Sequence, residues 1–287
     1  MTTLRQKMIE EMTLREFSPR TQEAYLRAVT ELAKYYNQSP DKITKGMIRD
    51  YLLYLIQDRK LAWSSRNIVI SGLKFFYTHT IGKKSLSLSI PPRKQTSKLP
   101  EILSGEELES LFGALSNQKH RTLLMTAYSA GLRLSEVVGL KVTDIDSKRM
   151  MIRVEQGKGR KDRYTILSKR LLTELRIYWK MYKPPVWLFC GANVKRPLTG
   201  RSAQSIYYKA KNMAGIKKGK GIHTLRHCFA THLLEAGVNV RTIQALMGHT
   251  SIMTTMIYLQ VTRKQISSTQ SPLDLLEIPE SNDFFKK

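Results

Sequence analysis

Apolar residues recur at helical spacing along the first part of the chain, and short stop signals separate the runs. Ser18 followed by Pro19 is typical of a helix start, with proline at the first helical position, and the apolar series behind it ends near Asn37. Two more apolar series cover residues 45–61 and a segment that Ser64 is expected to cap. We therefore predict a small all-helical domain over residues 1–85.

The rest of the chain mixes helical periods with short alternating segments. Ser104 to Glu107 is a capping-box sequence that opens a helix. Residues 150–155 and 163–167 alternate like two strands around a glycine-containing turn, and residues 186–189 predict one more short strand. Further helices are expected over 121–130, 134–140, 171–182 and 202–214. The expected fold is mainly α, with an N-terminal helical bundle and an α+β domain (residues 102–262) that holds a small antiparallel sheet.

The two patterns are separated by a segment of different composition. Residues 82–100 hold two adjacent prolines, five basic residues and no acidic one. This aperiodic composition predicts a semi-extended linker over residues 86–101. Its basic residues either follow a phosphate backbone or belong to a solvated tether, and both interpretations stay open. Residues 263–287 form a C-terminal tail beyond the second pattern.

The charge balance indicates a polyanionic partner. The chain carries 48 Lys and Arg residues against 23 Asp and Glu residues, a formal net charge of +25. Because the excess spans both halves of the sequence, it favours nucleic acid bound by both domains over a basic tail. A basic protein without such a partner is the alternative, since charge alone specifies no chemistry.

The sequence gives no support for a disulfide framework, a thiolate metal site, secretion or a membrane span. Cys190 and Cys228 are too few for a disulfide framework or a thiolate metal site. The N-terminus has no apolar core of a secretory signal, and no uncharged apolar run approaches the roughly 18 residues that span a bilayer. We expect a cytoplasmic protein that does not contact a membrane.

The densest group of reactive side chains lies in residues 223–258. His223 and Arg226 are three residues apart, so they share a helix face and can donate to one anion. An apolar stripe then runs to a stop at Gly237, and a second short helix over 240–246 ends at Gly248. A third helix, which Ser251 can cap, is expected to carry Tyr258.

These residue types suit an attack on a phosphodiester. Negative charge develops on the non-bridging oxygens, and the guanidinium groups of Arg133 and Arg226 offer forked, permanently charged donors to them. His223 adds a further hydrogen bond. The Tyr258 phenol supplies a nucleophile, but its ordinary pKa near 10 requires electropositive surroundings or a base. His249 can accept or orient the phenolic proton.

The leaving group has its own candidate. Lys158, in the turn QGKGRKD between the two predicted strands, can protonate the leaving 5′-oxygen as a general acid. The sequence contains no carboxylate cluster for magnesium and no GxxxxGK[ST] loop for ATP. The arginines therefore take the place of a metal, and no cofactor is expected.

Each motif is weak alone, but their joint order resembles the tyrosine recombinases, or lambda-type integrases, and among them the short Xer-like members. That family's pattern is arginine, hairpin lysine, histidine-x-x-arginine, histidine or tryptophan, and tyrosine. The matching residues here are Arg133, Lys158, His223, Arg226, His249 and Tyr258. The resemblance covers residues 101–260, and FSPRTQEAYL near the N-terminus and SPLDLL at 271–276 are similar to the corresponding family segments.

The resemblance implies a site-specific recombinase that cuts and rejoins DNA through a 3′-phosphotyrosyl link, without metal or ATP. It implies double-stranded DNA as partner, a tetramer of this chain on two DNA sites, and a cytoplasmic, nucleoid-associated location. An accessory DNA-bending or directionality protein is an open further partner. In related enzymes the tail packs on a neighbouring protomer, for which the expected anchors here are Leu273, Leu275, Leu276 and Ile278; a tail that packs on its own domain or is disordered is the alternative.

Two alternatives to this function stay open: a non-catalytic DNA-binding or regulatory protein on the same fold, and a topoisomerase that relaxes supercoils.

Other residues are expected to have structural or DNA-contacting roles rather than catalytic ones. Glu136 either orients Arg133 or faces solvent, and His227 is expected to be structural because it points about 100° away from Arg226 on a helix. His232 is also expected to be structural, Tyr164, Tyr207 and Tyr208 to pack, and a basic cluster to contact DNA: Lys209, Lys211, Lys217, Lys218 and Lys220.

Overall fold

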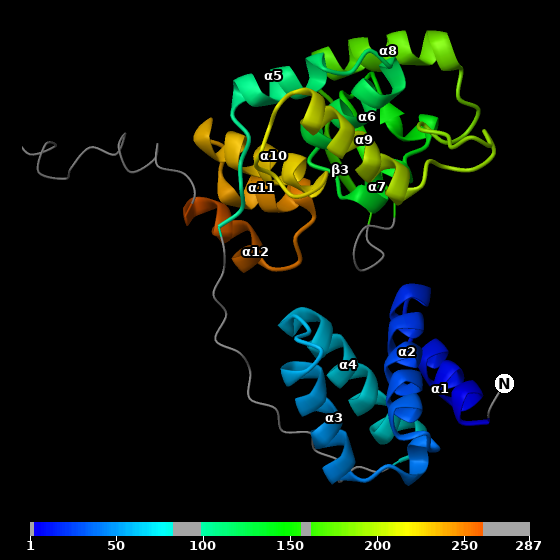
Figure 1. Ribbon diagram of the computed structural model, residues 1–287. Helices are drawn as coiled ribbons and strands as arrows, with labels where there is room; N and C mark the ends of the chain where they lie inside the picture. Colours follow the sequence, from blue (N-terminus) through cyan, green and yellow to red (C-terminus); the bar gives the residue numbers. More distant parts are fainter. Residues whose placement is uncertain (1–2, 83–98, 156–161, 261–287) are drawn as a thin grey trace, which may run out of the picture. The chain divides into compact units, whose positions relative to one another are not determined.

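The computed structural model describes residues 3–82, 99–155 and 162–260, and the chain divides into two compact units, Met1–Gln95 and Thr96–Lys287 (Figure 1). Each unit has its own hydrophobic core. The hairpin tip with Lys158, most of the predicted linker and the C-terminal tail with its expected anchors lie outside the described residues. Those predictions are therefore untested by the structure.

The first unit is a helical bundle, as predicted. At the start of its second helix the Ser18 hydroxyl accepts a hydrogen bond from the Thr21 amide, and Asn37 ends that helix in the left-handed conformation. Its helices are α1 (Thr3–Leu14), α2 (Pro19–Tyr36), α3 (Lys45–Gln57) and α4 (Trp63–Phe75), followed by a π-helical segment (Phe76–Thr80). The side chains of Met12, Leu32 and Leu73 are completely buried between them.

Two boundaries in this unit differ from the prediction. Helix α3 ends at Gln57 rather than near residue 61, because Lys60 takes a positive φ of 45° and turns the chain back so that the Leu61 amide donates to the Leu55 carbonyl. Helix α4 has Ala62 at its N-cap, without a side-chain cap, so Ser64 lies inside the helix. Helix α1 was not predicted.

The second unit is mostly helical (Figure 1). The Ser104 capping box opens its first helix, with Glu107 as the reciprocal partner. The helices are α5 (Gly105–Gly113), α6 (Gln118–Ser129), α7 (Leu134–Val138), α8 (Lys169–Tyr182), α9 (Gly200–Met213), α10 (His223–Glu235), α11 (Val240–Met247) and α12 (Ile252–Met256). In the part of the chain that the structure describes, no helix is both long and apolar enough to cross a membrane.

The small antiparallel sheet of this unit confirms the predicted fold class. Its strands, in spatial order, are β1 (Ile145–Asp146), β2 (Met151–Val154) and β3 (Arg163–Ile166). In the register of β2 and β3, Ile152 pairs with Thr165 and Val154 pairs with Arg163. Strand β1 was not predicted.

The strand predicted at residues 186–189 is wrong. Trp187 forms only an isolated antiparallel bridge with Lys141. Pro184 and Pro185 precede this segment. Proline has no amide hydrogen, so these residues cannot donate to a longer ladder.

Helix α10 carries the predicted site residues His223 and Arg226. It packs against α6, α11 and the 3-10 segment Ile257–Gln260. Phe229 from α10, Met247 from α11 and Tyr258 share one apolar cluster, and each is almost fully buried. Three segments of the motif region are thus brought together by hydrophobic packing.

Candidate active site

The two arginines of the predicted motif converge on one place. Gly131 has a positive φ of 59°, and a Cβ there would lie 2.3 Å from the Phe229 ring, so this turn before α7 requires glycine. Arg226, only 1% exposed, donates from Nη1 to the Gly131 carbonyl and from Nη2 to the Met247 carbonyl, both at 2.6 Å. Arg133 donates from Nη2 to the Gly248 carbonyl at 3.0 Å.

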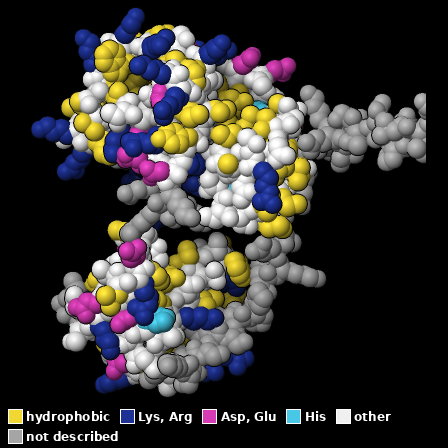
Figure 2. All heavy atoms as spheres, turned by 180° about the vertical axis from the view of Figure 1, so that it is seen from behind, with side chains coloured by type: hydrophobic (Ala, Val, Ile, Leu, Met, Phe, Trp, Pro, Cys, Tyr) yellow, Lys and Arg dark blue, Asp and Glu magenta, His cyan; other side chains and the backbone are white. Residues whose placement is uncertain are grey.

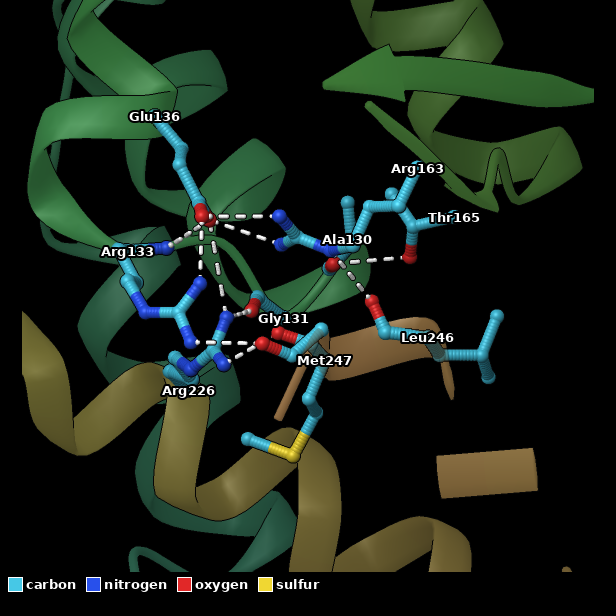
Figure 3. A network of polar contacts seen from close by, with 10 residues as sticks. Ala130, Gly131, Arg133, Glu136, Arg163, Thr165, Arg226, Leu246 and Met247 are labelled. Carbon is cyan, nitrogen blue, oxygen red and sulfur yellow. Dashed lines mark hydrogen bonds and ion pairs between the residues drawn. The ribbon is translucent and has the colours of Figure 1, made fainter. Parts of the chain in front are cut away.

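Glu136 is the anionic centre of this cluster (Figure 3). Its carboxylate accepts hydrogen bonds from the guanidiniums of Arg133 (2.7 Å) and Arg163 (2.8 Å to each oxygen), and Arg226 Nη1 lies 3.6 Å away. Burial alone raises the pKa of this carboxyl, but the hydrogen bonds from Arg163 and Arg133 outweigh it and lower the pKa to about 2. Glu136 therefore orients Arg133, as one of the two interpretations predicted, and does not face solvent.

A second anchor is the C-terminal end of helix α11. The last carbonyls of a helix lack intrahelical partners and carry partial negative charge. Three consecutive carbonyls here accept from three different guanidiniums. Arg163 Nε donates to Leu246 at 3.0 Å, and the Met247 and Gly248 carbonyls take Arg226 and Arg133. A Cβ at Gly248, which has a positive φ of 61°, would lie 2.7 Å from Arg163 Cδ.

The cluster carries an excess of positive charge. Three guanidiniums, those of Arg133, Arg163 and Arg226, face the single carboxylate of Glu136. Burial and the neighbouring Arg133 lower the pKa of Arg226 to about 10, so it remains cationic at neutral pH. An arrangement of this kind favours an additional anion.

The two predicted histidines are placed differently. His223 begins α10 and is exposed. His249 directly follows Gly248, and its Nδ1 is 2.8 Å from the Thr255 hydroxyl oxygen. Its ring is nearly parallel to that of Tyr258, with centroids 6.5 Å apart. Burial, then the charges of Arg226 and Arg133, lower the pKa of His249 to about 4, so this ring is neutral at pH 7.

Tyr258 lies in the same region, but not on the predicted third helix. Helix α12 ends at Met256, and Tyr258 sits in the following 3-10 segment, 4% exposed. Its hydroxyl is hydrogen-bonded to His227 Nδ1 at 2.9 Å. Burial raises the phenol pKa to about 12, although Arg226 and Arg133 act to lower it. The phenol is therefore protonated at neutral pH, within the field of both arginines.

Arg163 and His227 are the two site residues that the sequence interpretation missed. Strand alternation places Arg163 on the same face as the buried Thr165, whereas Tyr164 is exposed, so the two-residue period contained the signal for Arg163. His227 was expected to be structural because it points away from Arg226. It does point away, but towards Tyr258.

The remaining predicted residues have ordinary partners. His232 Nδ1 is 2.9 Å from the Tyr128 hydroxyl, in keeping with a structural role. Tyr207 is buried, whereas Tyr164 and Tyr208 are exposed. In the basic cluster, Lys211 donates to the Lys217 and Gly219 carbonyls and Lys218 pairs with Glu107, so these two ammonium groups are engaged within the chain. Among the described residues, no three His, Cys, Asp or Glu side chains gather as a metal ion would need.

Comparison with known proteins identifies the family of this chain. The phage integrase family matches residues 101–265, and the N-terminal SAM-like domain of phage integrases matches residues 4–85. The chain belongs to the phage integrase family. It is a tyrosine recombinase of the short, Xer-like kind, and thus an enzyme of site-specific recombination. The predicted family is confirmed, and the non-catalytic alternative is not supported.

Individual relatives match four fifths or more of the integrase chain. The protein y4qK of Sinorhizobium fredii, named as an integrase/recombinase, is 45% identical over 280 residues, which cover 97% of this chain and 91% of that one. The tyrosine recombinase XerA of Pyrococcus horikoshii is 34% identical over 234 residues, which cover 80% of this chain and 81% of that one. The fold is shared with the Tn1549 transposon integrase in complex with circular intermediate DNA (TM-score 0.69, 18% identity, covering 90% and 95%).

Proposed function

We propose that this recombinase cuts and rejoins double-stranded DNA through a 3′-phosphotyrosyl intermediate, with Tyr258 as nucleophile and without metal or ATP. The observation that carries the proposal is the phenol of Tyr258 in the field of Arg133 and Arg226, which belong to a cluster with more guanidiniums than carboxylates. A phosphodiester, which bears one negative charge, is attracted to that excess of positive charge. The resemblance to tyrosine recombinases supports the same roles.

The reaction follows from these groups. Arg133, Arg226 and His223 bind the non-bridging oxygens and stabilise the charge that develops on them. The Tyr258 oxygen attacks phosphorus, the bond from phosphorus to the 5′-oxygen breaks, and the phenolic proton passes to water. Lys158 protonates the departing 5′-oxygen. Because a phosphodiester is exchanged for a phosphotyrosyl ester, a free 5′-hydroxyl reverses the step and rejoining needs no cofactor.

The protonation states in the absence of DNA suit a nucleophile that stays inactive until substrate arrives. The pKa of Tyr258 is about 12 and that of His249 about 4, so neither is ionised at neutral pH. The Nδ1 of His249 contacts the Thr255 hydroxyl, which ties this ring to the short helix that precedes Tyr258. We propose that it fixes the segment that carries Tyr258.

Duplex DNA is the proposed partner of both units. The net charge is +25, and Lys and Arg side chains are scattered over both units on the face in Figure 2 rather than gathered at one end. Two duplexes that are each cut on two strands require four tyrosines, so we propose a tetramer on two sites, associated with the nucleoid. An accessory DNA-bending or directionality protein is a further partner in this proposal.

Covalent capture tests the function. Fragments of DNA that carry nicks are incubated with the protein, and a DNA–protein adduct is sought by denaturing electrophoresis; sequencing the captured DNA identifies the site. We expect an adduct with the wild-type chain, none with Tyr258→Phe, and an undiminished one with Tyr208→Phe, an exposed control. An adduct that persists in Tyr258→Phe would contradict the proposed nucleophile.

The topoisomerase alternative needs a different substrate. Plasmids with two copies of the captured site yield recombinants only if strands exchange partners. We expect recombinant plasmids from the wild-type chain. Relaxation of supercoils without any recombinant product would favour the topoisomerase.

A further inference from the structure

His227 lies between two groups of the proposed chemistry. It follows Arg226 on α10, so its side chain points about 100° around the helix from that guanidinium. Its Nδ1 is 2.9 Å from the Tyr258 hydroxyl oxygen, and its ring packs at 85° to that of His223, with centroids 4.9 Å apart. One side chain thus contacts both the proposed nucleophile and a proposed phosphate donor.

The Tyr258 hydroxyl needs a hydrogen-bond partner because its surroundings are apolar. Tyr258 belongs to an apolar cluster with Phe229, Ile243 and Met247, and a buried polar atom among such residues is destabilising unless it is hydrogen-bonded. His249, the residue predicted for this task, points its Nδ1 at Thr255. His227 therefore performs the contact that the sequence interpretation assigned to His249.

We propose that His227 is a positioning residue that orients the Tyr258 hydroxyl for attack by means of the hydrogen bond at its Nδ1. This inference rests on the proposed function of Tyr258. The hydrogen bond fixes one direction at the phenolic oxygen. It also fixes the torsion of the tyrosine side chain before DNA binds, which lowers the entropy lost in reaching the reactive geometry.

His227 is a positioning group rather than a proton acceptor. Burial, followed by the nearby His223 and Arg226, lowers the pKa of His227 to about 4, whereas the pKa of Tyr258 is about 12. A ring so weakly basic is a poor acceptor for a phenolic proton.

Three substitutions of one residue separate these roles. In His227→Asn the amide lies near the place of Nδ1 and retains a hydrogen-bonding group there. In His227→Gln the amide is displaced to the far side of the ring position, and His227→Leu removes the polar group. We expect single-turnover cleavage of a nicked substrate to fall about 10²-fold in His227→Leu, nearly as far in His227→Gln, and by less than about 10-fold in His227→Asn. DNA affinity stays at the wild-type value in all three.

The same helix offers a matched control. His232 Nδ1 is 2.9 Å from the Tyr128 hydroxyl oxygen, the same distance as in the pair of His227 and Tyr258. His232→Leu removes a comparable Tyr–His bond from α10, and we expect wild-type cleavage from it. Equal losses in His232→Leu and His227→Leu would overturn the proposal, because general weakening of α10 would explain both.

A measurement on the DNA-free protein keeps this test apart from the proposed function. Tetranitromethane nitrates accessible tyrosines, and peptide mass spectrometry reads the rate at Tyr258. We expect slow nitration in the wild-type chain and in His227→Asn, and nitration several-fold faster in His227→Leu. If Tyr258→Phe still forms adducts, the proposed role of Tyr258 as nucleophile is wrong, whereas the difference in nitration rate between His227→Leu and the wild-type chain is unaffected. Equal nitration rates in all variants, or a pH profile of cleavage that shifts in His227→Asn, would overturn the positioning role.

Discussion

The arginine half and the tyrosine half of the active site are held together by different kinds of interaction. In the arginine half, the guanidiniums of Arg133, Arg163 and Arg226 share one buried carboxylate and three consecutive helix-end carbonyls. In the tyrosine half, neutral hydrogen bonds link His227 to Tyr258 and His249 to Thr255, and Ser251 makes no cap bond to the short helix α12. Charge-assisted networks are roughly twice as strong per bond as neutral ones.

This difference matches what each half must do in the proposed reaction. Donors that stabilise developing charge are most effective when they are fixed before the substrate binds, since no reorganisation is then needed. The tyrosine must exchange partners, because its oxygen becomes part of a phosphoester. Neutral bonds, each contributing about 1 kcal/mol, allow that exchange at small cost.

The largest effect is expected from breaking the arginine half directly. Arg226→Ala should retain DNA binding but lower single-turnover cleavage by about 10²–10³-fold or more, because a fixed donor to the developing charge is lost. Arg133→Ala should behave in the same way. Cleavage within a few-fold of wild type would show that these guanidiniums do not serve the transition state. Gel-shift affinity measured beside the cleavage rate separates binding from chemistry.

A smaller effect, on stability, is expected at the centre of the same half. The Glu136 pKa is lowered from 4.5 to about 2, so its contribution to stability is present above pH 4.5 and is lost as the pH falls towards 2. Each pKa unit corresponds to about 1.4 kcal/mol, so Glu136→Gln should lower the free energy of unfolding at pH 7 by on the order of 3 kcal/mol. Urea unfolding at several pH values should show this difference shrinking below pH 4.5.

The control for that measurement is Glu109→Gln, since Glu109 is exposed on α5. It should change the unfolding free energy little at any pH. A constant difference between wild type and Glu136→Gln down to pH 2 would contradict the charged network.

The smallest effect is expected in the tyrosine half. Thr255→Val keeps the shape of the side chain but removes the hydroxyl partner of His249 Nδ1. The free energy of unfolding should fall by about 1 kcal/mol, the net worth of one neutral hydrogen bond. If Thr255→Val costs as much as Glu136→Gln in the same urea titration, the two halves are not held differently.

Sequence periodicity predicted most of the helices well where burial sets the pattern. Arg226 lies in the apolar rhythm of α10, and its neighbours Leu225 and Phe229 identify the buried side. Arg163 escaped prediction because its partners, Glu136 and the Leu246 carbonyl, are 27 and 83 residues away in the chain. The two-residue period of β3 indicates that Arg163 faces inward, but long-range pairing and main-chain acceptors leave no local pattern that identifies its partners.

The position of Tyr258 shows a second limit. A helix from Ser251 was expected to carry it, but the chain passes into a 3-10 segment after Met256, and boundaries of such short elements depend on tertiary packing. The bond to His227 follows from where that segment lies, which the sequence alone did not reveal. The role of Lys158 stays a prediction, since it lies outside the described residues.

The end of helix α11 carries an evolutionary consequence. All three arginines contact residues 246–248 through main-chain oxygens, so the side chains of Leu246 and Met247 can be exchanged for other apolar residues without loss of a donor contact. A change of chain length there has a larger effect, because one inserted or deleted residue shifts the carbonyls of residues 246–248 away from the guanidiniums that they bind. Related recombinases should therefore tolerate substitutions at this corner, apart from its glycine, but no gaps.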